Sequence, residues 1–145
     1  MRTNSDLTIY NKYIDSSTRS ERYQKTAILG VEWENKKGSN AIRSGGMAAA
    51  NQATIFIPFP GHLDTYLEPI AWVSSKSGRW TLQIGDIVVR GNVSDEIHPA
   101  VVSPPEAAFT ATDLKGKYDD VFVISSVDSM DMGSMSLRHW KVGVQ

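Results

Sequence analysis

Apolar and polar residues alternate along several short stretches of the chain, and a period of two is typical of half-buried β-strands. The alternation runs through residues 7–13 and 23–34, and Gly30 is a candidate β-bulge in the second stretch. Residues 53–60 form a short, strongly apolar strand that ends in prolines. In the second stretch the pattern predicts that four side chains share one face: Ala27, Leu29, Val31 and Trp33.

The segment WTLQIGDIVVRG, residues 80–91, predicts a β-hairpin with a two-residue turn. Gly85 at the first turn position suits a type II′ turn, which needs a positive φ there. Ile84 and Ile87 then face each other across the turn. We therefore interpret Asp86 as a turn residue rather than as a catalytic carboxylate.

A second hairpin is predicted at the end of the chain, where residues 121–130 and 135–144 flank the turn sequence DMGS. Short helical turns are expected within residues 67–74 and after Thr112 as an N-cap, with Gly116 near the helix end. The total is seven or eight strands. Short strands must pair or close on themselves to hide their edges. The pattern thus predicts one all-β domain over residues 1–145, a small antiparallel barrel or sandwich with one or two short helical turns.

Three regions of this domain are expected to be loops: residues 35–52, about 60–79 and about 92–118. The first is rich in glycine and alanine, with one short strand through residues 41–43, and we expect the rest to be mobile. Loops of this length are usually functional. Its candidate contact residues are Arg43, Gly45, Gly46 and Met47.

Methionines gather at the predicted tip of the second hairpin, where Met130, Met132 and Met135 fall within the sequence DSMDMGSM. Exposed apolar side chains at a tip usually mark a contact, and methionine adapts to irregular surfaces. Two interpretations stay open: the tip packs under a neighbouring loop, or Met132 and Met135 contact another subunit.

The composition excludes several classes of function for this chain. The chain has 145 residues, a net charge of −1 and no cysteine. Balanced charge gives no indication of bulk nucleic-acid binding. The absence of cysteine excludes disulfides, thiolate nucleophiles and cysteine-ligated zinc. The longest apolar run, ATIFIPFP, is too short to span a membrane, and the first residues lack the apolar core of a secretory signal.

No motif indicates catalysis, a cofactor or a metal. The three histidines have no HExxH spacing, and no GxSxG elbow marks a nucleophilic serine. We therefore predict a protein that is not an enzyme. Two alternatives from other classes stay open: a small hydrolase that uses His139 with a serine or aspartate, and a ligand-binding barrel that exposes aromatic rings such as Tyr66 and Trp72.

Four segments taken together resemble a family of small proteins in tailed phages and prophages of Gram-positive bacteria. They are LTIYNKYIDSSTRSERYQKTAILGVEW, ATIFIPF, RWTLQIGDIVVRG and LKGKYDDVFVISSVDSMDMGSMSLRHWKVG. These proteins resemble products of the head-to-tail morphogenesis cluster. The order of features also resembles that of head-closure, or stopper, proteins: an early strand pair, a mobile loop, a strand with Ile-Pro, a Gly-Asp hairpin and a final strand pair.

The resemblance implies a virion protein of the head–tail neck, made in the cytoplasm of the bacterial host. It implies a barrel that assembles into a ring of six or twelve copies beneath the portal, with loops that seal or line the DNA channel. The expected partners are other copies of the chain, a portal or adaptor protein, a tail terminator or tail tube protein, and phage DNA in the channel. An alternative role in the same class is tail termination or tail completion.

Overall fold

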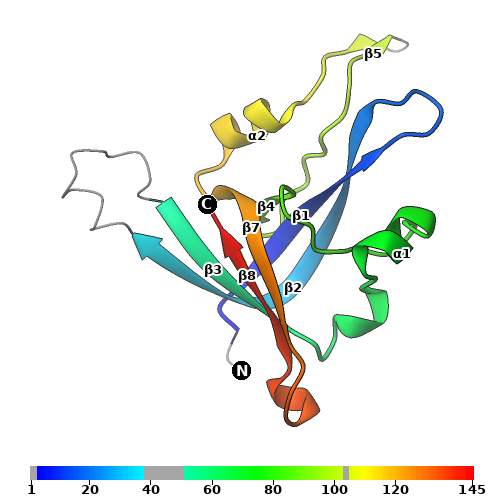
Figure 1. Ribbon diagram of the computed structural model, residues 1–145. Helices are drawn as coiled ribbons and strands as arrows, with labels where there is room; N and C mark the ends of the chain where they lie inside the picture. Colours follow the sequence, from blue (N-terminus) through cyan, green and yellow to red (C-terminus); the bar gives the residue numbers. More distant parts are fainter. Residues whose placement is uncertain (1–2, 38–50, 103–104) are drawn as a thin grey trace.

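Six antiparallel strands close into one barrel in the computed structural model, which describes residues 3–37, 51–102 and 105–145 (Figure 1). Around the barrel the order is β1, β2, β3, β8, β7 and β4. Their bounds are Ser5–Ile14 for β1, Glu21–Lys37 for β2, Asn51–Pro58 for β3, Ile87–Arg90 for β4, Val121–Met130 for β7 and His139–Val144 for β8. A separate two-stranded ribbon joins β5 (Val101–Val102) to β6 (Pro105–Glu106). The all-β prediction is confirmed.

Two strands turn from one side of the barrel to the other, and each turns at a register shift. The first part of β2 pairs with β1 and its second part with β3, and the shift lies opposite Gly30. Gly30 has φ 84°, and its N–H donates to Asp6 Oδ1 at 3.0 Å. Likewise β7 pairs with β4 through residues 121–123 and with β8 from Ile124 on, with a shift before Ser126. Bulges bend strands, so β2 and β7 each serve two sheets that pack against each other.

The Gly30 bulge is confirmed, and it corrects one expectation about the faces of β2. An extra residue reverses the alternation of side chains from that point on. Leu29 therefore points outward with 56% of its surface exposed, while Ile28 is buried with Val31 and Trp33. The prediction that Ala27, Leu29, Val31 and Trp33 share one face was wrong, because the bulge lies between the two pairs.

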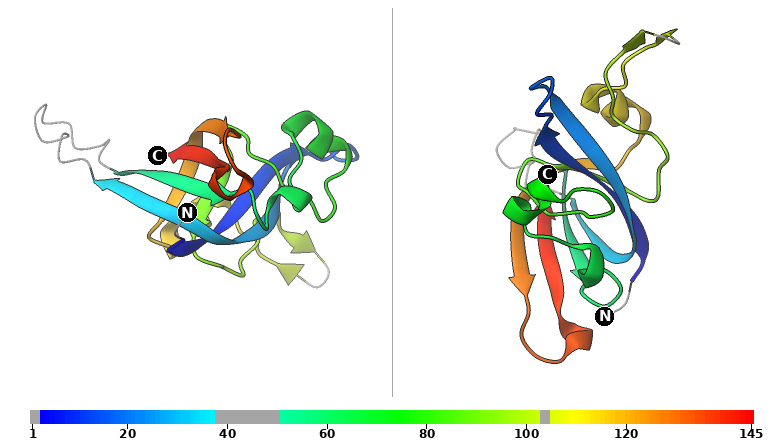
Figure 2. Two further views of the ribbon diagram at one scale, coloured as in Figure 1. Left: turned by 90° about the horizontal axis from the view of Figure 1, so that it is seen from below. Right: turned by 90° about the vertical axis from the view of Figure 1, so that its right-hand side faces the viewer.

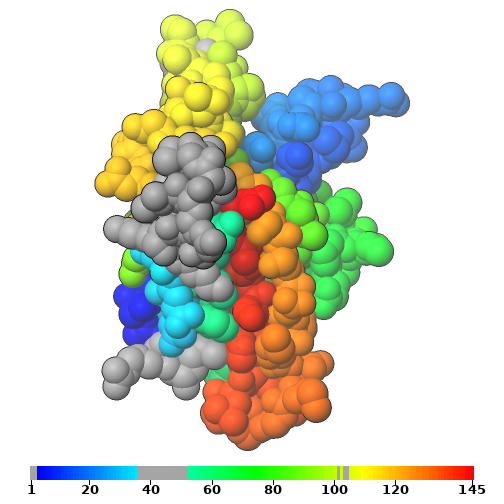
Figure 3. All heavy atoms as spheres, turned by 60° about the vertical axis from the view of Figure 1, so that its left-hand side comes forward, coloured from blue at the N-terminus to red at the C-terminus, as the bar shows by residue number. Residues whose placement is uncertain are grey.

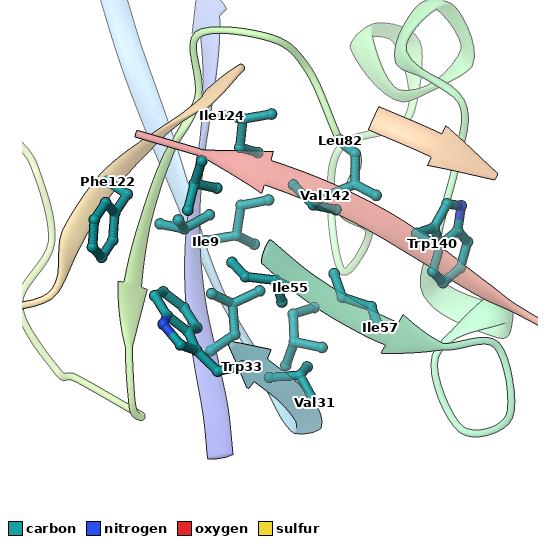
Figure 4. Close-up of a cluster of buried hydrophobic side chains, with 14 of the residues drawn as sticks. Ile9, Val31, Trp33, Ile55, Ile57, Leu82, Phe122, Ile124, Trp140 and Val142 are labelled. Atoms are coloured by element: carbon teal, nitrogen blue, oxygen red, sulfur yellow. The ribbon is translucent and has the colours of Figure 1, made fainter. Parts of the chain in front are cut away.

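The barrel interior is a continuous apolar core (Figure 4). Aromatic rings fill one end: Trp140 lies 4.3 Å from Phe59 and 5.3 Å from Trp80 between ring centroids, and Tyr66 lies 4.5 Å from Trp140. Tilted and edge-to-face geometries of this kind are favourable for aromatic pairs. A smaller cluster on the outer face of the β1–β4 sheet consists of Tyr10, Ile87, Val89 and Leu114.

Two short helices cover the barrel. α1 (Pro69–Ser74) is the short helical turn expected within residues 67–74, and it buries Trp72 in edge contact with Tyr13. α2 (Ala111–Lys117) supplies Leu114 to the outer cluster. Its N-cap is Thr110 rather than the predicted Thr112, because Asp113 lies three residues after Thr110 and completes a capping box. No helix within the described residues is long and apolar enough to cross a membrane.

Candidate interaction surface

The connection between β7 and β8 forms a defined tip at one end of the barrel, here called the methionine tip (residues 130–137). Gly133 adopts φ 85°, a left-handed conformation that suits glycine. The Arg138 Nε–H donates to the Gly133 carbonyl at 3.1 Å, and the Leu137 N–H donates to the Ser134 carbonyl at 2.9 Å. The tip lies at the lower end of the face seen in Figure 3, beyond the paired parts of both strands.

Large apolar side chains stand in solvent along this tip. Met132 is 86% exposed and Leu137 is 61% exposed, and Met130 and Met135 are exposed beside them. Of the two interpretations left open by the sequence, the described contacts do not show packing under a neighbouring loop. Four such side chains within eight residues are unusual for a surface in water. The role of Met132 and Met135 in contacting a partner stays a prediction.

The other predicted contact residues, Arg43, Gly45, Gly46 and Met47, lie outside the described residues, as does the short strand expected through residues 41–43. Two further exposed apolar side chains lie on α1, where Ile70 is 90% exposed and Val73 is also exposed. They form a smaller patch on a different element from the methionine tip.

The predicted Gly85–Asp86 hairpin is corrected by the structure. A turn is present: the Asp86 N–H donates to the Gln83 carbonyl at 3.2 Å, and Gly85 has φ 98°. However, β4 pairs with β1 on one edge and β7 on the other, so residues 80–84 form no hairpin with it. Ile84 is 73% exposed and does not face the buried Ile87. Both edges of β4 were needed to close the barrel.

Asp86 itself is buried, with 1% of its surface exposed. The sequence pattern predicted a turn residue there and gave no sign of a buried polar group. Its Oδ1 accepts the Lys12 N–H at 3.1 Å, and its Oδ2 accepts the Asn11 Nδ2–H at 2.7 Å. Gln83 donates from Nε2 both to Asp86 and to the Lys12 carbonyl, the latter at 3.1 Å. Asn11 also donates to the Thr81 carbonyl at 2.8 Å. These side chains occupy the edge of β1 beyond the point where β4 ends, and we call them the β1 edge cap.

Burial raises the pKa of the Asp86 carboxyl, and the hydrogen bonds from Gln83, Asn11 and Lys12 partly oppose that rise. Burying a carboxylate costs free energy unless hydrogen bonds satisfy it, and here three donors do so. Asp86 lies at a strand edge, and the side chains that donate to it also bond backbone carbonyls there. This position indicates a structural carboxylate. The alternation of apolar residues gave no signal of this, since the cap joins positions 75 residues apart in sequence.

The two alternatives from other classes receive no support from the positions of their key residues. The His139 Nδ1–H donates to the Leu137 carbonyl at 2.9 Å, and the ring meets Phe56 in edge geometry. Within the described ranges, the histidine in ion-pair range of a carboxylate is His98, 3.5 Å from Glu106. No cluster of three potential ligands for a metal ion occurs among those residues. Trp72 is buried and Tyr66 packs on the core, so neither ring forms an exposed binding face.

The fold and the surface define a small closed antiparallel barrel that carries an exposed apolar tip. The chain belongs to DUF6751, a family of unknown function, whose family model matches residues 2–145. Comparisons with curated proteins and with solved structures gave no match.

Proposed function

We propose that this protein is a structural component of the head–tail interface of a tailed phage, a head-closure or neck connector that works by ring assembly and not by catalysis. The observation that supports this proposal best is the methionine tip, a defined turn with four exposed apolar side chains on a well-packed barrel. A rigid scaffold that presents an apolar tip suits lasting contact with another protein. The resemblance of the sequence to phage morphogenesis proteins supplies the class of partner.

In this proposal the protein forms a ring of six or twelve copies in the virion neck. A portal or adaptor protein lies on one side of the ring, and a tail terminator or tail tube protein lies on the other. The barrel supplies stability, and the methionine tip reaches the neighbouring protein. Burial of the tip removes Met132, Met135 and Leu137 from water, and burying each such side chain contributes on the order of 1.5–3 kcal/mol.

The test uses a phage or prophage that encodes this chain and the double variant Met132→Asp with Met135→Asp. We expect filled heads that fail to join tails in electron micrographs, and a loss of infectious titre of at least a hundredfold. The matched control is the double variant Ile70→Asp with Val73→Asp, which places the same added charge on the exposed patch of α1 and should leave the titre unchanged.

Two results would contradict the proposal: virions that lack the protein by mass spectrometry, or normal particle assembly when its gene is deleted. If deletion instead gives closed heads with tails of irregular length, the protein is a tail terminator rather than a head-closure protein. That outcome keeps the neck location and changes the partner.

A further inference from the structure

The β1–β2 ribbon has two edges, and the hydrogen bonds identify which backbone groups face outward. In an antiparallel pair, successive residues direct their N–H and C=O groups alternately toward the partner strand and away from it. The Lys12 N–H points away from β2, because it donates to Asp86 Oδ1. The Asp6 carbonyl also points away, because it accepts the Gly91 N–H at 2.7 Å. The backbone N–H and C=O groups of the even-numbered residues of β1 therefore point away from β2.

The same rule assigns the outer edge of β2. Lys12 lies opposite Tyr23 in the register. The other even-numbered residues, Tyr10 and Thr8, lie opposite Lys25 and Ala27 of β2. Their N–H and C=O groups consequently point away from β1. On that side β3 begins to pair only at Glu32. Among the described residues, no backbone group bonds to the outer edge of β2 between residues 21 and 27.

Space lies beside this open edge. A groove of about 430 Å³ separates residues 26–30 of β2 from the end of β3 and the segment that follows it. The far wall of the groove includes Pro58 and Pro60. Proline has no backbone N–H to donate, so an added strand would pair with β2 rather than with that wall.

The barrel has a second open edge on β7. Beyond the register shift before Ser126, residues 126–130 pair with β8 on one side. The pairing with β4 on the other side ends at Val123. The last backbone bonds on that side join the Ile124 N–H to the Asp86 carbonyl at 2.8 Å and the Gly85 N–H to the Ile124 carbonyl at 2.9 Å. In the right-hand view of Figure 2, β7 (orange) borders the sheet, and no strand of the described residues lies beyond it.

The charges on the two open edges are complementary. The β2 edge, residues 21–27, carries Arg22 and Lys25 against the single acid Glu21. The second half of β7 carries Asp128, Asp131 follows it in the methionine tip, and residues 124–131 contain no base. Opposite charges on facing strands stabilise pairing, whereas like charges oppose it.

We propose that copies of this chain join by strand addition, in which the open edge of β7 in one copy pairs with the open edge of β2 in the next. This inference rests on the ring assembly proposed above and specifies its contact. The two edges are different surfaces, so the contact is heterologous and generates a ring when the rotation between copies closes. Main-chain hydrogen bonds supply affinity in such added strands, and side chains supply selectivity.

The decisive variant is Ala27→Pro, measured on the purified full-length chain by native mass spectrometry and analytical ultracentrifugation over a range of concentrations. Proline at this position removes an outward N–H and leaves the ladder to β1 intact. We expect the oligomer to dissociate at a concentration at least tenfold higher, with unchanged circular dichroism. The matched control Ala27→Val keeps the N–H and should assemble as the original chain does.

A charge exchange tests the pairing independently if Ala27→Pro does not fold. Arg22→Asp and Asp128→Arg should each weaken assembly several-fold, and the double variant should recover it. A chain that stays monomeric at every concentration would overturn the inference. So would a folded Ala27→Pro variant that assembles normally, or a double variant that assembles no better than the single ones.

These outcomes separate the inference from the proposed function. If virions contain the protein but the edge variants assemble normally, the function stands and the strand addition fails. If the chain assembles through its edges but is absent from virions, the strand addition stands and the neck assignment fails.

Discussion

The two edges of the β1–β2 ribbon differ in how their backbone groups are hydrogen-bonded. Along β1, strand β4 covers residues 7–10, and the β1 edge cap satisfies the Lys12 N–H and C=O beyond it. Along β2, the outward groups of Tyr23, Lys25 and Ala27 meet no backbone partner among the described residues. One edge is closed with a buried carboxylate, which is a costly group to bury. An unprotected edge is an aggregation hazard, and this contrast is why we propose that the open edge receives another strand.

The largest effect on this comparison is expected from Asp86→Ala. The change leaves the Lys12 N–H and one of the two Asn11 amide hydrogens without an acceptor, and each unsatisfied donor costs about 1–3 kcal/mol. We expect a loss of about 3 kcal/mol in the free energy of unfolding, measured by urea denaturation. The control Asp119→Ala removes an exposed aspartate and should change stability by less than about 0.5 kcal/mol. Equal stability of the two variants would show that Asp86 does not hold the β1 edge.

A smaller loss is expected from Gln83→Ala, which opens one half of the cap. The variant removes the donor to the Lys12 carbonyl while Asp86 still accepts the Lys12 N–H. We expect a loss of about 1 kcal/mol by the same denaturation assay. Gln52→Ala, at an exposed position of β3, is the matched control. A loss as large as that of Asp86→Ala would mean that the two residues act as one unit.

The pH dependence of stability should isolate the cost of the buried charge. The folded-state pKa of Asp86 is raised by burial, so the folded protein holds this proton more tightly than the unfolded chain does. The stability from this group is therefore complete below about pH 4, the ordinary range of aspartate, and falls as the pH rises through the raised pKa. The stability difference between the original chain and Asp86→Asn should shrink over that window in urea titrations. A difference that grows with pH would contradict the assignment.

Hydrogen exchange tests the comparison without any substitution. In the dilute monomer the Lys12 amide should be protected, because Asp86 accepts its hydrogen. The amides of Tyr23, Lys25 and Ala27 should exchange much faster, since they face solvent or the groove. Amide exchange followed by NMR measures both sets in one sample. Protection of Tyr23 equal to that of Lys12 would show that the β2 edge is not open.

Much of the barrel was predictable because its strands are locally amphipathic. The stretches around β1, β2, β3, β7 and β8 were all expected from the period-two pattern, and Gly30 was expected as a bulge. The errors occurred where long-range pairing overruled a local signal. Residues 80–84 alternate like a strand, yet β4 has β1 and β7 on its two edges, so they cannot pair with β4. Trp80 forms a parallel bridge with Tyr66 instead. A turn sequence alone therefore could not determine which strands meet.

The sequence by itself determined the fold class, the strand stretches and the methionine tip, because each depends on residues close together along the chain. The tertiary structure alone decided the role of Asp86 and the state of the strand edges. The Asp86 carboxylate receives its donors from positions 11, 12 and 83, and an edge is open only when no distant strand reaches it. Those are properties of closure of the barrel, which no local pattern encodes.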